Sequence, residues 1–452
     1  MPDRIDDESL VRERARPDTR ADSSTRPANR ARIDFALIAA VATGVPLAFW
    51  ILSTLAGHGS SFNDFHDFYY AARLILEGHS PYDKAALAAL AKTEGQAFVV
   101  GTGYSYPLPF AIAMIPFAWL PFGTSVMAFG GLGLALYGLV VGRWIVWFHG
   151  SAASLRRRLL LAAIAGAYPS IYGTIANGQA NLLLMPFLAF GTIYVLDGER
   201  VGRIGGGIAV GLAAVVKLIP GLFVVPLVLG RRFGSAAAVV VAAGAALGLA
   251  SLLLPWAQQG SDGLLNLTEP DAYFTNQSIN GFVSRLVLQS ERTLPLWNHA
   301  FDARIVAALA TICLGLLTLW ILWARRLELR QRRGLAIGLA LALTAGLLAA
   351  PKGTYWNQAM LVVAAGLVIA VEIPDLRLTR SDGRRVVHRV DYGLVGSWLL
   401  GTTMQTALWF TPPPKFTELS AVVTLATSAS VYGMAALYAF VGRRLWITHR
   451  GM

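Results

Sequence analysis

The stretch ARIVAALATICLGLLTLWILWA, residues 303–324, decides the fold class. Its one charged residue, Arg304, stands near the start of the stretch. An apolar run of about 20 residues crosses the ~30 Å hydrocarbon core of a bilayer as a helix. The segment therefore predicts a transmembrane helix. Comparable apolar stretches lie at about 107–122, 125–148, 159–176, 181–196, 205–229, 235–255, 334–350, 357–371, 391–411 and 418–440.

Composition supports the same fold class for the whole chain. The 452 residues are 55% hydrophobic and 14% charged, and the mean hydropathy is +0.54. A soluble domain carries about 25% charged residues. We therefore expect an all-α polytopic membrane protein, a bundle of about 10 to 13 transmembrane helices that absorbs the whole length.

The net charge of +12 comes from arginines in short clusters between apolar segments. This distribution follows the positive-inside rule for cytoplasmic loops. It indicates a membrane protein in contact with lipids and argues against nucleic acid as a partner. The single cysteine, Cys313, lies in an apolar stretch, so the sequence predicts no disulfide framework and no cysteine metal site.

The charge pattern also predicts an orientation. We expect residues 1–33 to be a disordered basic cytoplasmic tail, residues 34–443 a single transmembrane bundle, and residues 444–452 a cytoplasmic C-terminal tail. A first span at Phe35–Leu55 then delivers residues 57–105 to the outer side of the plasma (inner) membrane as the first outer loop. The triplet Arg156–Arg158 conflicts with two crossings between Pro107 and Phe148. Either one of these stretches is re-entrant or the triplet is an exception.

The most informative polar segment is NDFHDFYYAA, residues 63–72, directly after the first span. Aromatic residues are expected there as interface anchors, whereas carboxylates are not needed for anchoring. Asp64, partly desolvated near the bilayer surface, could serve as a general base, with Asp67 as the reserve candidate. The alternative is that Asp64 caps the helix that follows.

Other polar side chains interrupt the apolar runs. A lysine within hydrocarbon is suspected of a function, although Lys217 could also extend to the interface. The remaining groups also fit solvated loops or turns. Together they suit an enzyme that handles a lipid-borne phosphate donor and a polar acceptor. The candidates for contact with this donor or acceptor are His66, Tyr69, Tyr104, Tyr106, Gln179, Asn181, Lys217, Asn276, Gln277, Arg285 and Lys352.

Six short motifs follow one another along the chain. They are D-F-x-x-F-Y-x-A-A from Asp64, G-x-x-P-Y-D from Gly78, Y-x-Y-P from Tyr104, G-Q-x-N-x-L-L from Gly178, K-L-x-P from Lys217 and N-Q-S-x-x-G-x-x-x-R-L from Asn276. In this order the chain resembles glycosyltransferase family 87, which includes polyprenol-phosphate-mannose-dependent mannosyltransferases. The resemblance covers roughly half of the chain, from Asp64 to Leu286.

The resemblance implies a GT-C fold with a helical first outer loop and an active site on the outer face. It implies transfer of a hexose, with mannose favoured, from a polyprenyl-phosphate donor to a lipid or glycan acceptor, with inversion. Asp64 would be the base, and Lys217, Arg285 and Lys352 would be the candidates for charge on the donor phosphate. The chain departs from the family at Ala350–Pro351–Lys352 and Trp356–Asn357–Gln358, where a histidine is often found.

No cofactor and no metal site are expected, because the sequence has no dense carboxylate cluster. Metal dependence stays open, because GT-C enzymes differ in whether they need a metal. A transporter or flippase of a lipid-linked or polar substrate is the alternative function. It is the weaker one because no apolar span carries a convincing acid in mid-membrane. A non-catalytic scaffold is a third hypothesis, favoured if Asp64 and Asp67 are buried in a tight helix cap.

Overall fold

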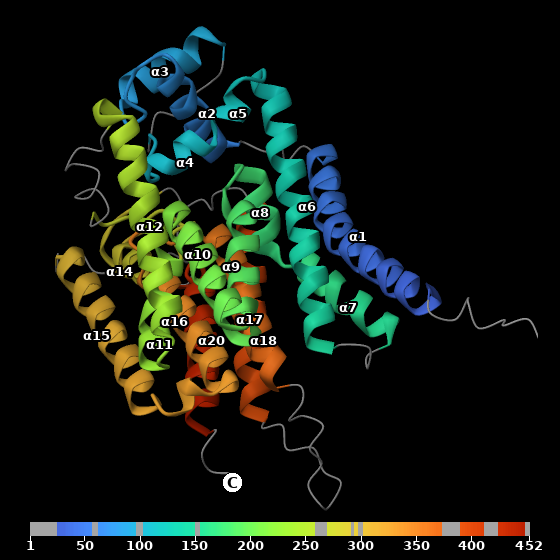
Figure 1. Ribbon diagram of the computed structural model, residues 1–452. Coiled ribbons are helices and arrows are strands. Elements are labelled where there is room, and N and C mark those ends of the chain that lie inside the picture. Colours follow the sequence, from blue (N-terminus) through green and yellow to red (C-terminus); the bar gives the residue numbers. More distant parts are fainter. Residues whose placement is uncertain are drawn as a thin grey trace, which may run out of the picture.

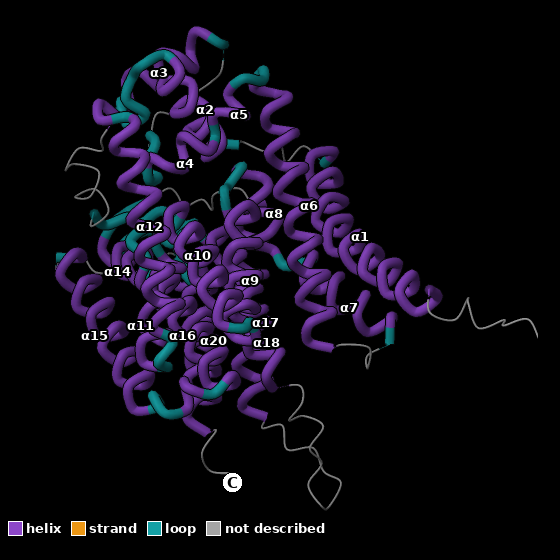
Figure 2. Tube along the Cα trace, viewed as in Figure 1, coloured by secondary structure: helices purple, strands orange, loops and turns teal. Residues whose placement is uncertain are grey.

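The structure is a computed structural model that describes residues 25–56, 62–95, 103–149, 154–257, 269–290, 293–296, 302–372, 389–410 and 424–447. Residues 1–24 and 448–452 of the expected tails lie outside the described residues. Helices and loops make up the described chain (Figure 2), apart from one isolated antiparallel bridge between Asn276 and Thr354. The expected all-α polytopic membrane class is confirmed.

The first half of the chain builds the cap at one end of the bundle and one side of the bundle (Figure 1). Its helices are α1 (Thr25–Leu55), α2 (Asn63–Leu76), α3 (Lys84–Thr93), α4 (Leu108–Ala113), α5 (Ile115–Ala118), α6 (Phe122–His149), α7 (Leu155–Gly166), α8 (Pro169–Asn177), α9 (Asn181–Asp197), α10 (Arg200–Val216), η2 (Ile219–Phe223) and α11 (Val224–Leu229). Helix α1 begins at Thr25, ahead of the first span expected from Phe35.

The second half supplies the remaining bundle helices. They are α12 (Phe233–Leu253), η3 (Pro255–Ala257), α14 (Ile279–Val287), α15 (Ala303–Ala324), η5 (Glu328–Arg330), α16 (Arg332–Ala349), η6 (Tyr355–Met360), α17 (Leu361–Glu372), α18 (Arg389–Phe410) and α20 (Ala429–Ile447). Helices α18 and α20 pack side by side, and α20 also packs against α16.

Five of the described helices are long and apolar enough to cross a membrane: α1, α6, α12, α15 and α16. The pair α7 and α8 adds a sixth span if it is counted as one helix bent by 49°. Helix α16 is 83% buried over its apolar window, whereas α1, α12 and α15 are 17% buried over theirs. Helix α16 is therefore the centre of the bundle, and the exposed apolar faces of the other three are available to lipid.

Three other apolar stretches form shorter helices, at Asn181–Asp197, Ile219–Leu229 and Tyr355–Val368. A helix needs about 20 residues to cross the hydrocarbon core alone. Polar residues stand at the start of two of these helices, where Asn181 and Tyr355 are buried inside the protein. Polar backbone at such breaks has to be covered by neighbouring protein.

The stretch at 107–122 does not form a span. It folds into α4 and α5, of six and four residues. Four prolines (Pro107, Pro109, Pro116 and Pro121) cannot donate backbone hydrogen bonds, and they limit each helix to a turn or two. Helix α6 is thus the one crossing between α5 and α7.

This single crossing removes the conflict over the arginine triplet. Helix α6 returns the chain to the end of the bundle at which α1 begins (Figure 1). There Arg158 Nη1 lies 3.5 Å from Asp34 Oδ2, which places the start of α7 beside the start of α1. Arg156–Arg158 and the N-terminal end of α1 therefore lie at the same end of the molecule.

Helices α2 to α5 gather at the opposite end and form a cap on the bundle (Figure 1). Ten residues of α2 are buried, including Phe65, Phe68 and Tyr70. Their rings pack with Phe122 and Phe129 of α6. The aromatic residues of the first loop therefore form a second hydrophobic core, which fixes α2 over the ends of α6 and α8.

Candidate active site

Asp64 is the second residue of α2. No side chain caps this helix, and the residue at the N-cap position is Phe62, whose φ of 47° is left-handed. Phe62 N donates a hydrogen bond of 3.1 Å to Ala176 O, which anchors the start of α2 to the end of α8. The helix-cap alternative for Asp64 is therefore wrong, and its carboxylate is left for other partners.

The turn between α8 and α9 supplies the first of these partners. Gly178 ends α8 in the left-handed conformation, with φ 65°, which glycine adopts without strain. A Cβ at this position would come within 2.5 Å of Phe65 Cβ, so the turn also depends on close approach to α2. The turn places Gln179, which is 6% exposed, directly under Asp64.

Lys217 comes from a break between α10 and η2. The backbone leaves the helix there with φ −141° and ψ 130°, three residues before Pro220. Its Nζ donates 3.0 Å to Gln179 Oε1 and also donates to Asn357 Oδ1. The ammonium lies 5.5 Å from the centre of the Tyr106 ring. Lys217 is therefore held inside the protein by polar and aromatic partners.

These contacts determine the orientation of the Gln179 amide. An ammonium donates hydrogen bonds and accepts none, so the oxygen of the amide must face Lys217. Tyr106 OH also donates to this oxygen, over 2.7 Å. The amide nitrogen of Gln179 is then left to hydrogen-bond Asp64. One amide therefore connects the acid to the cation.

Burial raises the pKa of Asp64 to about 6, because removal from water disfavours the charged carboxylate. The Gln179 hydrogen bond and the positive charge of Lys217 lower the pKa by less. A carboxylate of this kind is ionised at neutral pH but binds a proton more readily than an exposed aspartate. It therefore has the acid–base properties of a general base.

Asn181 and Thr174 complete the floor of the site. Asn181 Nδ2 donates to Trp356 O over 2.9 Å and contacts Asn357 Oδ1 at 3.5 Å. Thr174 Oγ1 donates to the same Trp356 carbonyl over 3.1 Å. These bonds attach η6 to α8 and α9, and so bring Asn357 to Lys217.

Asn357 was not among the expected site residues. In the sequence it follows Pro351–Lys352–Gly353 and precedes an apolar stretch, which is also typical of a solvated loop. A signal that could have found it is the amide pair Asn357–Gln358 at the start of the apolar run, where water would not satisfy both side chains.

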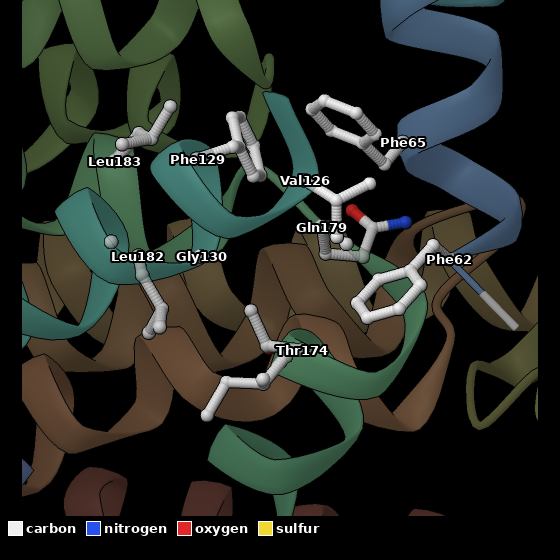
Figure 3. A pocket seen from close by; sticks show the side chains of 12 residues that line it. Phe62, Phe65, Val126, Phe129, Gly130, Thr174, Gln179, Leu182 and Leu183 are labelled. Atoms are coloured by element: carbon white, nitrogen blue, oxygen red, sulfur yellow. The ribbon is translucent and has the colours of Figure 1, made fainter. Parts of the chain in front are cut away.

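A small cavity of about 20 Å³ adjoins the site between α2, α6, α8 and α9, with room for about one water molecule. Figure 3 shows the Gln179 side chain among Val126, Phe62 and Phe65, with Thr174 across the pocket. Asp64 is not part of its lining and keeps part of its own surface exposed. Asp64 is therefore accessible from this exposed side rather than from within the cavity.

The expected residues Asn276, Gln277 and Arg285 form a second polar cluster. Gln277 Nε2 donates to Phe274 O and Thr427 O, and its Oε1 accepts from Val431 N. Arg285 is fully buried and donates to Tyr273 O, Asn276 O and Ser428 Oγ. Burial lowers the pKa of Arg285 to about 10, so it stays cationic at neutral pH. Most polar atoms of this cluster are thus occupied by the protein itself.

The other expected residues have separate surroundings. Tyr69 OH donates to Leu120 O, Tyr104 OH donates to Pro107 O, and His66 Nδ1 lies 3.0 Å from Phe62 O. Asp67 is 8% exposed and lies one helical turn beyond Asp64, whereas Lys352 is exposed beside the second cluster. The structure therefore brings together Asp64, Tyr106, Gln179, Asn181 and Lys217, with the other seven donor or acceptor candidates outside this group. Within the described part of the chain, no three His, Cys, Asp or Glu side chains gather as a metal site would require.

Fold and site together define a helical multi-pass membrane protein with an acid and a cation joined by an amide beneath a capping loop. A model of glycosyltransferase family 87 matches residues 104–351, which is more than half of the chain. The chain therefore belongs to glycosyltransferase family 87. The matched region contains Gln179, Lys217 and Arg285, and it begins after Asp64.

Two curated relatives have the same name, polyprenol-phosphate-mannose-dependent alpha-(1-2)-phosphatidylinositol mannoside mannosyltransferase. The one from Mycolicibacterium smegmatis is 28% identical over 302 residues, which is 62% of this chain and 62% of the relative. The one from Mycobacterium tuberculosis is 28% identical over 264 residues, which is 51% of this chain and 59% of the relative. The chain thus spans less than two thirds of the length of these relatives. No solved structure matches it.

Proposed function

We propose that this protein is a membrane mannosyltransferase that moves a mannosyl group from a polyprenyl-phosphate donor to a hydroxyl group of a lipid or glycan acceptor. Family membership and the names of the two relatives support this class of donor. The observation that carries the proposal is the arrangement of Asp64, Gln179 and Lys217. It separates a proton acceptor from a cation by the length of one amide group.

The two charged groups have complementary roles in the reaction. Asp64 removes the proton of the acceptor hydroxyl as its oxygen attacks C1 of the mannosyl group. The bond between C1 and the phosphate oxygen breaks, and the leaving polyprenyl phosphate gains the negative charge. Lys217 stabilises this charge as it develops. Attack on the face opposite the phosphate inverts the configuration at C1.

The network explains why the acid and the cation do not neutralise each other. The structure records no ion pair between Asp64 and Lys217, and Gln179 interacts with both groups. A direct ion pair would stabilise the carboxylate and weaken it as a base. The amide keeps both groups oriented while leaving each free to meet one substrate.

The arginine distribution supports an active site on the outer face of the plasma membrane. Arg156–Arg158, the loop before α16 and the last turn of α20 lie at the end of the bundle opposite α2 (Figure 1). Cytoplasmic loops carry the excess of Lys and Arg. On this basis the N-terminus is cytoplasmic, and Asp64 faces the other side with its lipid-borne donor and acceptor.

The test is transfer by the purified protein in nanodiscs, with a short-chain polyprenyl-phosphate [14C]mannose as donor. Phosphatidylinositol mannosides are the first acceptors to assay because the relatives' names include them. The expected result is a new glycosidic bond, found by mass spectrometry, that Asp64→Asn abolishes. Movement of the donor across liposomes with no glycosylated product would instead support the transporter or flippase function.

A further inference from the structure

Asn357 is a side chain from the second half of the chain that contacts both Lys217 and Asn181. It belongs to the short helix η6 and is 8% exposed. Its Oδ1 accepts from Lys217 Nζ and lies 3.5 Å from Asn181 Nδ2. Its backbone N donates 2.9 Å to Thr354 O. Both contacts of the side chain therefore end on its oxygen.

The orientation of the Asn357 amide follows from the chemistry of its partners. Lys217, as an ammonium, and the amide nitrogen of Asn181 are both donors, so the group that faces them has to be an acceptor. Exchanging the oxygen and nitrogen of Asn357 would place three donors together. The amide nitrogen therefore points away from Lys217 and lies on the other side of the same amide group.

This nitrogen is a hydrogen-bond donor without an acceptor among the described residues. It is absent from the set of sealed polar atoms that lack a partner, whereas Nε2 of the neighbouring Gln358 belongs to that set. Asn357 Nδ2 therefore reaches accessible space. The third hydrogen of the Lys217 ammonium is likewise without an acceptor among the described residues.

We propose that Asn357 is a substrate-binding residue whose Nδ2 donates to a phosphate oxygen of the polyprenyl-phosphate donor, next to Lys217. The proposal rests on the function proposed above and deepens it. Two side chains in direct contact that each keep a donor without a described acceptor favour a ligand with acceptors, and the charge of the cation favours an anion. A phosphate meets both conditions, whereas a sugar hydroxyl meets only the first.

One substitution separates this binding role from a role in positioning Lys217. Asn357→Asp keeps an oxygen for Lys217 and Asn181, but it replaces the outward donor with a second oxygen that carries negative charge. A residue that only positions Lys217 would tolerate this change. A phosphate-binding residue would not, because the new oxygen repels the ligand.

The experiment measures binding of bare short-chain polyprenyl phosphate to the full-length protein in nanodiscs, by tryptophan fluorescence, beside steady-state transfer. For Asn357→Asp we expect Kd for the bare phosphate and KM for the donor to rise about tenfold or more. The matched control is Gln289→Glu, the same change of charge at an exposed position, which should leave both unchanged. Asn357→Ala gives the same comparison, with a rise of about fivefold, if the aspartate variant does not fold.

Two results would overturn the proposal. One is an unchanged Kd for the bare phosphate in both Asn357 variants. The other is weaker binding of the mannosylated donor with unchanged binding of the bare polyprenyl phosphate, which would assign Asn357 to the sugar. Because binding is measured without turnover, a wild-type protein that binds the phosphate but transfers nothing would contradict the proposed function and still test Asn357.

Discussion

Gln179 Oε1 lies 3.0 Å from Lys217 Nζ, and this contact turns the nitrogen of the same amide toward Asp64. The acid and the cation are therefore connected without being paired. In the proposed reaction, the length of the Gln179 side chain would set the distance between the acceptor hydroxyl and the donor phosphate.

Asp64→Asn should lower kcat about a thousandfold, because the amide cannot accept the proton of the acceptor. Asn keeps an oxygen for the hydrogen bond from Gln179, so the thermal midpoint should stay near that of the wild type. Asp67→Asn is the matched variant one turn along α2 and should retain most of the activity. A loss confined to the Asp67 variant would make that residue the base.

The pH dependence of transfer follows from the raised pKa of Asp64. Its carboxylate must be deprotonated to act, and the pKa is about 6. We expect kcat/KM to be level above this pH and to fall about tenfold per unit below it. Initial rates measured between about pH 4.5 and 8 would show this fall, because a single general base loses its proton over this range. An activity that increased toward acid would contradict the assignment.

Gln179→Glu should move the acidic limb to higher pH. One oxygen of the new carboxylate still accepts from Lys217 and Tyr106, while the other faces Asp64. A like charge raises the pKa of a neighbouring carboxyl, so the limb should shift upward by about one unit. Gln331→Glu, exposed at the far end of the molecule, is the control and should leave the profile in place.

Gly178→Ala should reduce both stability and activity. The position has a φ of 65°, and the added methyl would meet Phe65 Cβ at 2.5 Å. Strain and displacement together should cost about 2 kcal/mol and move α2 away from Gln179. Gly244→Ala in α12 has open space around the new methyl and should leave activity unchanged. Thermal unfolding and transfer assays on both variants would measure the difference.

Arg285→Met should lower the thermal midpoint rather than donor affinity. The change leaves the carbonyls of Tyr273 and Asn276 without their buried donor, at a cost of about 2–5 kcal/mol. Donor KM, measured below the unfolding temperature, should stay within about twofold of the wild type. A large rise in KM at unchanged stability would show instead that Arg285 contacts the donor.

The sequence predicted the membrane class well because hydropathy directly reflects the cost of placing a segment in lipid. It predicted the division of the 107–122 stretch poorly, since an average over the stretch hides the four prolines that break it. Hydropathy thus identified an apolar segment but could not give its path.

The candidate site was predicted in part for a similar reason. Polarity in an apolar setting identified Gln179 and Lys217, and the structure brings both to Asp64. The same criterion selected Gln277 and Arg285, which mostly hydrogen-bond to other parts of the protein instead. A sequence shows that a buried polar group needs a partner, but not whether this partner is a ligand or the protein.

The bridge between Asn276 and Thr354 connects the second polar cluster to the segment that carries Asn357. Gln277 N donates a hydrogen bond of 2.7 Å to Gly353 O, and Tyr355 N donates one of 2.9 Å to Thr275 O. These hydrogen bonds hold the two loops together. Since Asn357 follows Tyr355 by two residues and contacts Lys217, we expect a substitution near Asn276 to shift Asn357 against Lys217. Distant, chemically silent positions in the C-terminal half can therefore tune the reaction during evolution.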